Sequence, residues 1–211
     1  MVNLIGVSGK SGAGKTSFAK HAVKVFGGVK MAMGDALKDE VSGFLLSIGA
    51  NFEHRHLYGT QADREESFEV SMHYWCASDY RPRRVLNGYV KVRGGTVSLS
   101  YRSLLQLWGT EYRRAQDPHY WETKVEERLR EIEEGLVIID DIRFESEAQM
   151  VLNNNGRLVR VNRPGRARIA TPDHESETAL DTYPCFNWHI FNGGSLDDFQ
   201  EEVEHVMGFM I

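Results

Sequence analysis

Cysteine is scarce in this sequence, which has only Cys76 and Cys185 among its 211 residues. Two cysteines without a C-x-x-C spacing form no disulfide framework, and their scarcity fits a reducing compartment. No stretch of roughly 18 apolar residues occurs, which argues against a transmembrane helix. Because the chain opens directly into an apolar run at Val2, we also expect no signal peptide.

The sequence also has no excess of positive charge. It carries 25 Lys and Arg against 30 Asp and Glu, for a net charge of −5. Proteins that bind polymeric nucleic acid usually have a basic face, so this balance argues against that class. Nucleotide monomers remain compatible, because a few local arginines suffice to bind them. With no internal repeat and no low-complexity segment, the length suits one compact domain with a lid or an insert.

A phosphate-binding motif lies near the N-terminus. Residues 9–16 read GKSGAGKT, a full match to G-x-x-x-x-G-K-[ST]. Residues 2–7 before it predict a buried strand, and residues 16–26 after it predict a helix. In this setting backbone N–H groups and the helix N-terminus surround phosphate oxygens, Lys15 reaches the β- and γ-phosphates, and the Thr16 hydroxyl joins a Mg²⁺ shell. The alternative, a Gly-rich turn that matches by chance, is disfavoured by the strand and the helix on either side.

Paired carboxylates end a second apolar strand. Residues 136–139 are apolar and are followed by Asp140 and Asp141. This is the Walker B arrangement, in which a buried strand delivers an acid to the sheet edge beside the phosphate loop. Apolar strands that end in Asp are common, so the pattern gains its weight from the motif at residues 9–16. Arg143 follows two residues later.

An arginine-rich loop follows further along the chain. Residues 162–168 contain Arg163, Arg166 and Arg168 together with Pro164 and Gly165. Such a loop could close over a transferring phosphoryl group, balance its charge and exclude water. A solvated basic turn is the alternative.

The remaining periodicity predicts alternating strands and helices around a parallel sheet. We expect a helix that begins at Asp35 as N-cap and a final helix that begins after Ser195. We expect Leu196, Phe199, Val203, Val206 and Met207 to share the buried face of that final helix. Further strands are expected at residues 29–33, 158–161 and 187–191, and further helices at residues 100–114, 118–134 and 144–154.

Residues 50–98 are the least regular part of the sequence. A Gly94-Gly95 turn between alternating residues predicts a β-hairpin, either a substrate flap or a surface insert. Residues 78–84 are expected to form a basic loop. His54, His56 and His73 match no common metal-binding spacing, so we expect them on the solvated surface.

Three polar side chains are spaced to share a stripe on the helix over residues 100–114. Arg102, Gln106 and Arg113 lie at i, i+4 and i+11. Two guanidiniums and an amide would suit the phosphate and base edge of a nucleotide. An ordinary solvated helix face is an equal alternative.

Several further segments of the chain carry a family resemblance. They are RSLLQLWGTE at residues 102–111, residues 117–121, Asp141-Ile142-Arg143, residues 161–165, HESE at residues 174–177 and FNGGSL at residues 191–196. With the order of the features above, they are similar to nucleoside monophosphate kinases, and more specifically resemble the phage deoxynucleoside monophosphate kinases. Matches lie along most of the chain but are poor between residues 50 and 98. Animal phosphomevalonate kinases are similar over Trp108-Gly109, the Asp-x-Arg and residues 175–177, which keeps a non-nucleotide acceptor open.

The resemblance implies transfer of the ATP γ-phosphate to a deoxynucleoside 5′-monophosphate, which gives the diphosphate. It implies a three-layer α/β P-loop kinase fold with a central parallel sheet and an inserted β-hairpin. The implied organisation is one domain over residues 1–211, with an acceptor-binding region at about 35–115 and an Arg-rich lid at about 163–178. The acceptor base stays open, because residues 50–98 depart from the pattern.

The resemblance also implies roles for particular residues. ATP would be held by Gly9, Lys10, Ser11, Gly12, Ala13, Gly14, Lys15, Thr16 and Ser17, with Asn192 near the adenine. Catalysis would fall to Lys15, Asp141, Arg143, Arg163, Arg166 and Arg168, and Mg²⁺ would be bound by Thr16 and Asp141. The acceptor would be held by Asp35, Lys38, Arg102, Gln106, Gly109, Thr110, Arg113, Trp121 and Glu175.

The implied partners are small molecules, with no polymeric nucleic acid and no membrane. The implied location is the cytoplasm, or the host cytoplasm if a phage encodes the chain, and the oligomeric state stays open, a homodimer included. A nucleotide-dependent switch protein is the competing class. A GTPase would need the guanine-reading N-K-x-D, which is absent, and an Arg loop in the same chain favours a small-molecule kinase.

Overall fold

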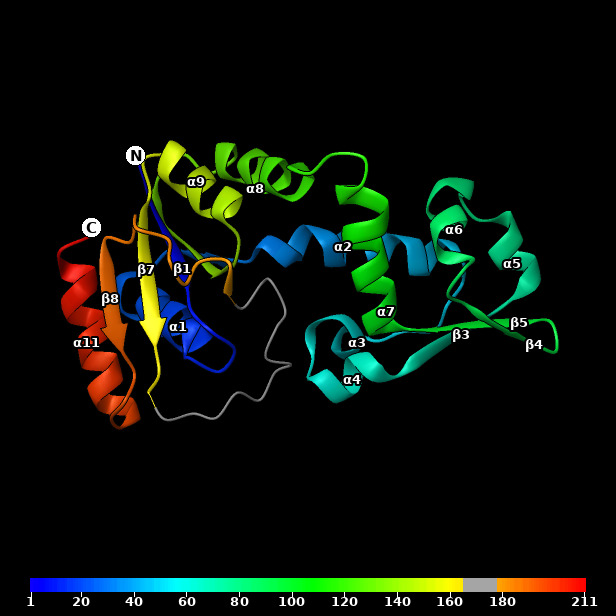
Figure 1. Ribbon diagram of the computed structural model, residues 1–211, viewed down its shortest axis with the longest axis horizontal. Helices are drawn as coiled ribbons and strands as arrows, with labels where there is room; N and C mark the ends of the chain where they lie inside the picture. Colours follow the sequence, from blue (N-terminus) through cyan, green and yellow to red (C-terminus); the bar gives the residue numbers. More distant parts are fainter. Residues whose placement is uncertain (165–177) are drawn as a thin grey trace. The chain divides into compact units, whose positions relative to one another are not determined.

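The computed structural model describes residues 1–164 and 178–211. The chain divides into two compact units, one formed by Met1–Met33 with Val125–Ile211 and the other by Gly34–Lys124 (Figure 1). We call them the parallel-sheet unit and the inserted unit. The inserted unit covers the region of about 35–115 to which the sequence analysis gave acceptor binding. That role, and a single kinase domain over residues 1–211, stay predictions.

The parallel-sheet unit is built on five strands, all parallel, in the order β2-β6-β1-β7-β8. The strand expected before the phosphate-binding motif and the strand that ends in the paired carboxylates are neighbours at the centre of the sheet. The central parallel sheet expected from the sequence is therefore confirmed. The strands are β1 (Val2–Ser8), β2 (Val29–Met31), β6 (Gly135–Ile142), β7 (Arg157–Asn162) and β8 (Trp188–Phe191).

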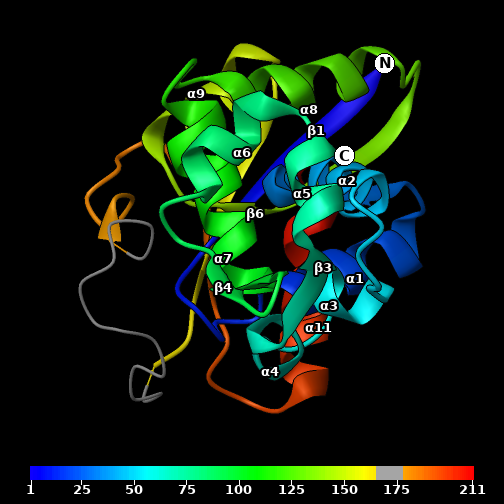
Figure 2. The ribbon, with the colours of Figure 1, turned by 90° about the vertical axis from the view of Figure 1, so that its right-hand side faces the viewer.

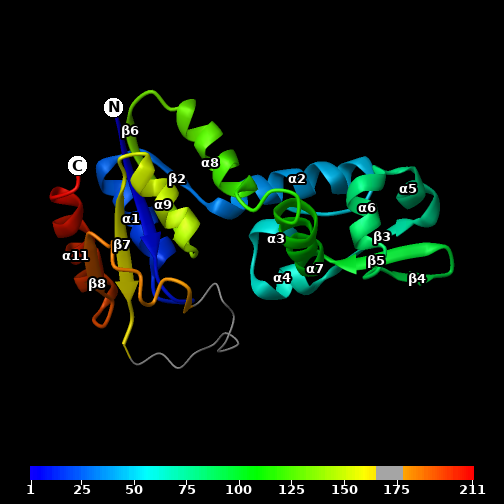
Figure 3. The same cartoon turned by 45° about the horizontal axis from the view of Figure 1, so that its top comes forward.

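Helices cover both faces of this sheet (Figures 1 and 3). On one face, α1 (Lys15–Phe26) packs beside α11 (Leu196–Gly208). On the other, α9 (Glu145–Asn153) packs on β1 and β7. This gives the three layers that the sequence predicts.

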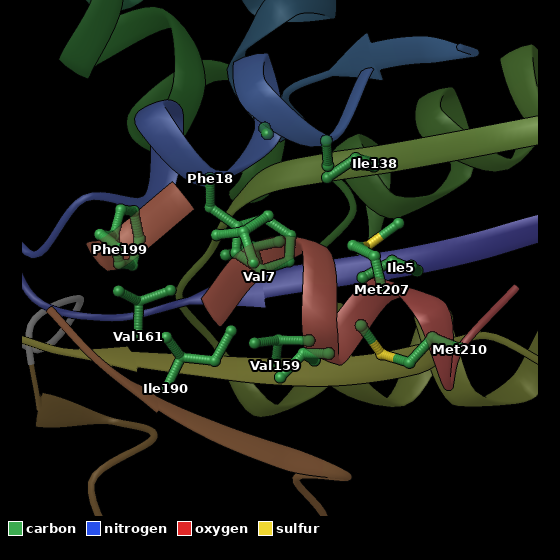
Figure 4. Packing of buried hydrophobic residues seen from close by; sticks show 14 of the residues in the cluster. Ile5, Val7, Phe18, Ile138, Val159, Val161, Ile190, Phe199, Met207 and Met210 are labelled. Carbon is green, nitrogen blue, oxygen red and sulfur yellow. The ribbon is translucent and has the colours of Figure 1, made fainter. Parts of the chain in front are cut away.

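The alternation of side chains along β1 decides which face each residue reaches. Ile5 and Val7 point into the cluster beneath α1 and α11, together with Phe18 (Figure 4). Gly6 faces α9, where an added Cβ would lie 3.0 Å from Val151 Cγ2. The expected buried face of α11 is correct except at Leu196, whose side chain is 60% exposed.

The inserted unit combines short helices with a small antiparallel sheet in the order β3-β5-β4 (Figure 2). The expected hairpin is confirmed, with Gly94 and Gly95 at φ 57° and 80° in its turn. Its β5 strand also pairs with β3, so the hairpin is part of a three-stranded sheet. The elements are α2 (Met33–Ser47), α3 (His54–Tyr58), α4 (Gln61–Glu65), β3 (Ser67–Ser71), α5 (Met72–Ala77), α6 (Tyr80–Leu86), β4 (Lys91–Arg93), β5 (Thr96–Ser100), α7 (Tyr101–Gln106) and the π-helix η1 (Leu107–Arg114).

Two expectations for residues 50–98 are wrong. The basic loop at residues 78–84 is largely the helix α6, which the Asp79 side chain caps by accepting a hydrogen bond from the Arg81 N–H at 3.0 Å. His56 is buried, because its ring stacks on Tyr101 at 4.4 Å and its Nδ1 accepts from the Glu53 N–H at 2.9 Å. The cap of α6 is a short-range interaction that hydrophobic periodicity does not register, and the Tyr101 ring that stacks on His56 lies far from it in the sequence.

Two helix boundaries also differ from the sequence prediction. The helix α2 begins at Met33, so Asp35 lies in its first turn and is not the N-cap. A carboxylate there still complements the helix dipole. The helix expected at residues 118–134 is α8 (Tyr120–Arg130), which begins later and ends earlier than expected. Within residues 1–164 and 178–211, no helix is long and apolar enough to cross a membrane.

Candidate active site

The phosphate-binding motif forms a tight turn between β1 and α1. Gly9 has φ 149°, and an added Cβ would lie 2.4 Å from the Val161 carbonyl oxygen. Gly14 has φ 114°, and a Cβ there would lie 2.5 Å from Asn192 Nδ2. Both positions therefore require glycine on two counts, the backbone conformation and the lack of space.

The Lys15 side chain lies over this loop. Its Nζ donates hydrogen bonds to the carbonyl oxygens of Gly9 at 2.6 Å and Lys10 at 3.1 Å, and the residue is only 9% exposed. The ammonium group is thus held at the loop by neutral acceptors. A phosphate oxygen is a stronger, charged acceptor for the same donor.

A pocket of about 360 Å³ opens at the N-terminus of α1. This volume lies in the range of small-molecule sites. Asn192 supports the pocket, because its Nδ2 donates to the Ala13 carbonyl oxygen at 2.8 Å. The combination of helix N-terminus, lysine and arginine suits a polyphosphate. The pocket is lined by Gly12, Gly14, Lys15, Thr16, Ser17, Arg163, Asn192, Gly194, Leu196 and Phe199.

The two carboxylates lie at an irregularity in β6. Gly6 pairs with Ile139 and Ser8 with Ile142, so two residues, Asp140 and Asp141, stand opposite Val7. Such bulges are common beside active sites, where they redirect side chains. No local sequence pattern predicts this irregularity.

The surroundings of the two carboxylates differ. Asp140 is 5% exposed and pairs with Lys30 at 3.3 Å. Asp141 is half-buried, and its Oδ1 accepts from the Met33 N–H at 2.7 Å. Carboxylate and hydroxyl oxygens are the ligands that Mg²⁺ prefers, so Thr16 and Asp141 fit the predicted magnesium site chemically.

The arginines predicted for catalysis are only partly described. Arg143 is half-buried directly after β6, and its backbone N–H donates to Glu147 Oε2 at 2.7 Å. Arg163 lines the pocket. Arg166, Arg168 and Glu175 lie outside the described residues.

The inserted unit separates the three residues expected on one stripe. The segment that carries Arg113 is a π-helix, which turns less per residue than the α-helix that carries Arg102 and Gln106. Arg102 pairs with Glu65 at 3.4 Å, whereas Arg113 pairs with a different carboxylate. The shared stripe is therefore wrong, and the roles of the three residues stay predictions.

Glu40, the partner of Arg113, is not among the residues predicted from the sequence. Its carboxylate accepts from Arg113 Nε at 2.7 Å, from Trp108 Nε1 at 2.9 Å and from the Tyr120 hydroxyl. The Arg113 guanidinium also lies 4.6 Å and 4.7 Å from the ring centres of Tyr112 and Tyr120. Nothing local distinguishes Glu40 from the other acidic residues of α2, because its partners lie about 70–80 positions away.

The titration of Tyr120 reflects this cluster. Burial, followed by the hydrogen bond to Glu40, raises the pKa of Tyr120 to about 12. The phenol therefore stays protonated as a donor to Glu40 at neutral pH.

The other predicted acceptor residues also lie in the inserted unit. Asp35 pairs with Lys38 at 3.3 Å. The Gly109 carbonyl oxygen accepts from Trp121 Nε1 at 3.2 Å, and a Cβ at Gly109 would lie 3.2 Å from Leu37 Cδ2. Thr110 is exposed. Their roles toward an acceptor stay predictions.

No family model matches the chain. A curated protein of Acanthamoeba polyphaga mimivirus, named "Putative deoxynucleotide monophosphate kinase", is 27% identical over 202 residues, which cover 95% of this chain and 93% of that protein. Among solved structures, dephospho-CoA kinase from Campylobacter jejuni superposes with a TM-score of 0.51 at 13% identity, over 99% of this chain and 96% of the other. At that identity the structural likeness concerns the fold alone.

The resemblance expected from the sequence is confirmed by these two comparisons, and so is the fold class. The chain has the fold of a P-loop kinase and is similar over nearly its whole length to the mimivirus protein named "Putative deoxynucleotide monophosphate kinase".

Proposed function

We propose that this protein transfers the γ-phosphoryl group of ATP to a deoxynucleoside 5′-monophosphate, giving ADP and the deoxynucleoside diphosphate. The observation that carries the proposal is the phosphate loop. It folds with Lys15 at its centre and opens on a pocket of about 360 Å³. The similarity to the mimivirus protein supports the acceptor class.

The reaction needs no protein nucleophile. An oxygen of the acceptor phosphate, already anionic at neutral pH, attacks the γ-phosphorus while the bond to the bridging oxygen breaks and ADP leaves with that electron pair. Catalysis then consists of alignment and charge neutralisation. Lys15 and Arg163 supply positive charge in the pocket, and Arg143 supplies it beside β6.

The carboxylate edge of β6 completes the proposed ATP site. Thr16 and Asp141 would hold Mg²⁺, and Asp140 lies next to Asp141 in the same β-bulge of β6. When bound, the metal ion would neutralise phosphate charge. Arg166 and Arg168 are proposed as further cations on the sequence pattern alone.

For the acceptor we propose the guanidinium groups of the inserted unit. Arg113 donates to Glu40 through Nε. The two terminal nitrogens of the Arg113 guanidinium have no hydrogen-bond partner among residues 1–164 and 178–211. Two terminal nitrogens in one plane can bind a phosphate in a bidentate manner. Arg102 and Gln106 are exposed on α7 and offer a second set of donors.

An ADP-release assay with ATP and Mg²⁺ tests the proposal. The acceptors would be dTMP, dGMP, dCMP, dAMP, their ribose counterparts, modified pyrimidine monophosphates and phosphomevalonate. Turnover that depends on a deoxynucleotide supports the proposal and identifies the base.

The other outcomes contradict it in distinct ways. Turnover with phosphomevalonate alone would keep the phosphotransfer and replace the acceptor. Slow ADP release that ignores every acceptor would indicate a nucleotide-dependent switch protein. A Lys15→Ala preparation, assayed in parallel, excludes a contaminating kinase.

A further inference from the structure

One carboxylate in the parallel-sheet unit lies between two cations. Asp181 Oδ2 is 2.8 Å from Lys10 Nζ, and Asp181 Oδ1 is 2.5 Å from Arg160 Nη2. Lys10 belongs to the phosphate loop, and Arg160 to the strand β7. Asp181 therefore connects the loop to the sheet through its two oxygens.

The connection reaches the loop a second time through Arg160. Its Nη1 donates to Ser8 Oγ at 3.0 Å, and Ser8 is the last residue of β1. Ser8 and Lys10 are the two neighbours of Gly9, whose carbonyl oxygen accepts from Lys15 Nζ at 2.6 Å. The start of the phosphate loop is thus held on both sides of Gly9.

The two arms of this connection differ in burial. Arg160 is 7% exposed and Ser8 is 2% exposed, so the guanidinium needs its counter-ion. Arg160 is further fixed by the Phe186 ring, 5.6 Å from its guanidinium carbon. The Lys10 side chain is 45% exposed, so its ion pair adds little to stability. Its effect is to restrict where the loop lies.

We propose that Asp181 is a positioning residue for nucleotide binding. Acting through Lys10 and Arg160, it holds Ser8, Gly9 and Lys10 in the conformation that receives the phosphates. A loop held in its binding conformation loses less entropy when the ligand binds. The inference rests on the phosphate-loop part of the proposed function and does not depend on the acceptor.

Isothermal titration calorimetry with MgADP and with adenosine tests the inference. Asp181→Asn should raise the Kd for MgADP about twofold to fivefold, the size expected for a half-exposed ion pair, while the Kd for adenosine stays unchanged. General damage to the fold would weaken the binding of MgADP and of adenosine alike. Asp181→Glu should recover part of the affinity for MgADP.

A double-mutant cycle separates the Lys10 arm. In a Lys10→Met background, Asp181→Asn should raise the Kd for MgADP by less than half the factor that it causes in the wild-type background. The reason is that the Lys10 tether is already lost in that background. Equal factors in both backgrounds would show that Asp181 does not act through Lys10. An unchanged or lower Kd for MgADP in Asp181→Asn would overturn the inference as a whole.

Two controls keep these outcomes distinct. Glu202→Gln removes one exposed negative charge from α11 in the same unit and should leave the Kd for MgADP unchanged. If Asp181→Asn does not fold, Asp181→Glu still tests the tether by the ratio of its two Kd values to those of the wild type. The titrations contain no acceptor and do not depend on the reaction. If the Kd for MgADP rises in Asp181→Asn as expected but the protein shows no kinase turnover, only the proposed reaction is rejected.

Discussion

The carboxylate of Glu40 accepts a hydrogen bond from Arg113 Nε at 2.7 Å, across 73 positions of the sequence. The same carboxylate accepts from Trp108 and Tyr120, so three donors fix its orientation. The Arg113 guanidinium also lies over the rings of Tyr112 and Tyr120, so the ion pair and the two rings together hold it in place. If the proposed function holds, it prepares Arg113 for the phosphate of the acceptor.

Replacing Arg113 with Ala should therefore raise the acceptor KM by about tenfold to a hundredfold, the size of a lost charge-assisted hydrogen bond. The ATP KM should change little. Steady-state kinetics with each substrate varied in turn measures both values. Arg130→Ala is the matched control, because Arg130 is an exposed arginine on α8 paired with Glu126. An unchanged acceptor KM in Arg113→Ala would place the acceptor elsewhere.

Lys15→Ala should lower kcat by about a hundredfold to a thousandfold, as when a donor to developing charge is removed. The fold should survive, because Lys15 Nζ donates hydrogen bonds to carbonyl oxygens of the loop itself. Circular dichroism and thermal melting check the fold, and the ADP-release assay checks kcat. Near-normal turnover in a folded variant would remove Lys15 from the mechanism.

Gly9→Ala should abolish tight MgADP binding or prevent folding, since its Cβ would lie 2.4 Å from the Val161 carbonyl oxygen at a φ of 149°. Calorimetry and thermal melting measure the two effects. Gly43→Ala is the control. Gly43 is an exposed position inside α2 with no atom within 4 Å of an added Cβ. That change should raise the free energy of unfolding by about 0.5–1 kcal/mol. Equal behaviour of the two variants would contradict the loop geometry.

The pKa of Tyr120, raised to about 12, predicts a pH dependence of stability. The unfolded chain loses this proton near pH 10 and the folded chain near pH 12, so the folded state binds more protons between these values. The contribution of Tyr120 is therefore complete below about pH 10 and is lost as the pH rises toward 12.

Denaturant unfolding of the wild type and Tyr120→Phe across pH 9 to 12 measures this effect. The free energy of unfolding should fall more steeply with pH in the wild type than in Tyr120→Phe. Parallel curves would mean that Tyr120 titrates like an exposed phenol.

Parts of both units follow from local sequence. Residues 9–16 with an apolar run before them and a helical pattern after them are sufficient for the phosphate loop. The Gly94-Gly95 turn is sufficient for the hairpin. In each case the deciding interactions lie within a few positions, where glycine conformations and periodicity act directly.

The arrangement of the site residues was decided by the tertiary structure. Arg113 follows Arg102 and Gln106 at a spacing that predicts one stripe, yet the π-helix and Glu40 place it in other surroundings. Asp181 shows no local pattern, and only folding brings it to Lys10 and Arg160. The physical reason is the same for both. A charged side chain takes its position from the partner that compensates its desolvation, and those partners lie far away in sequence.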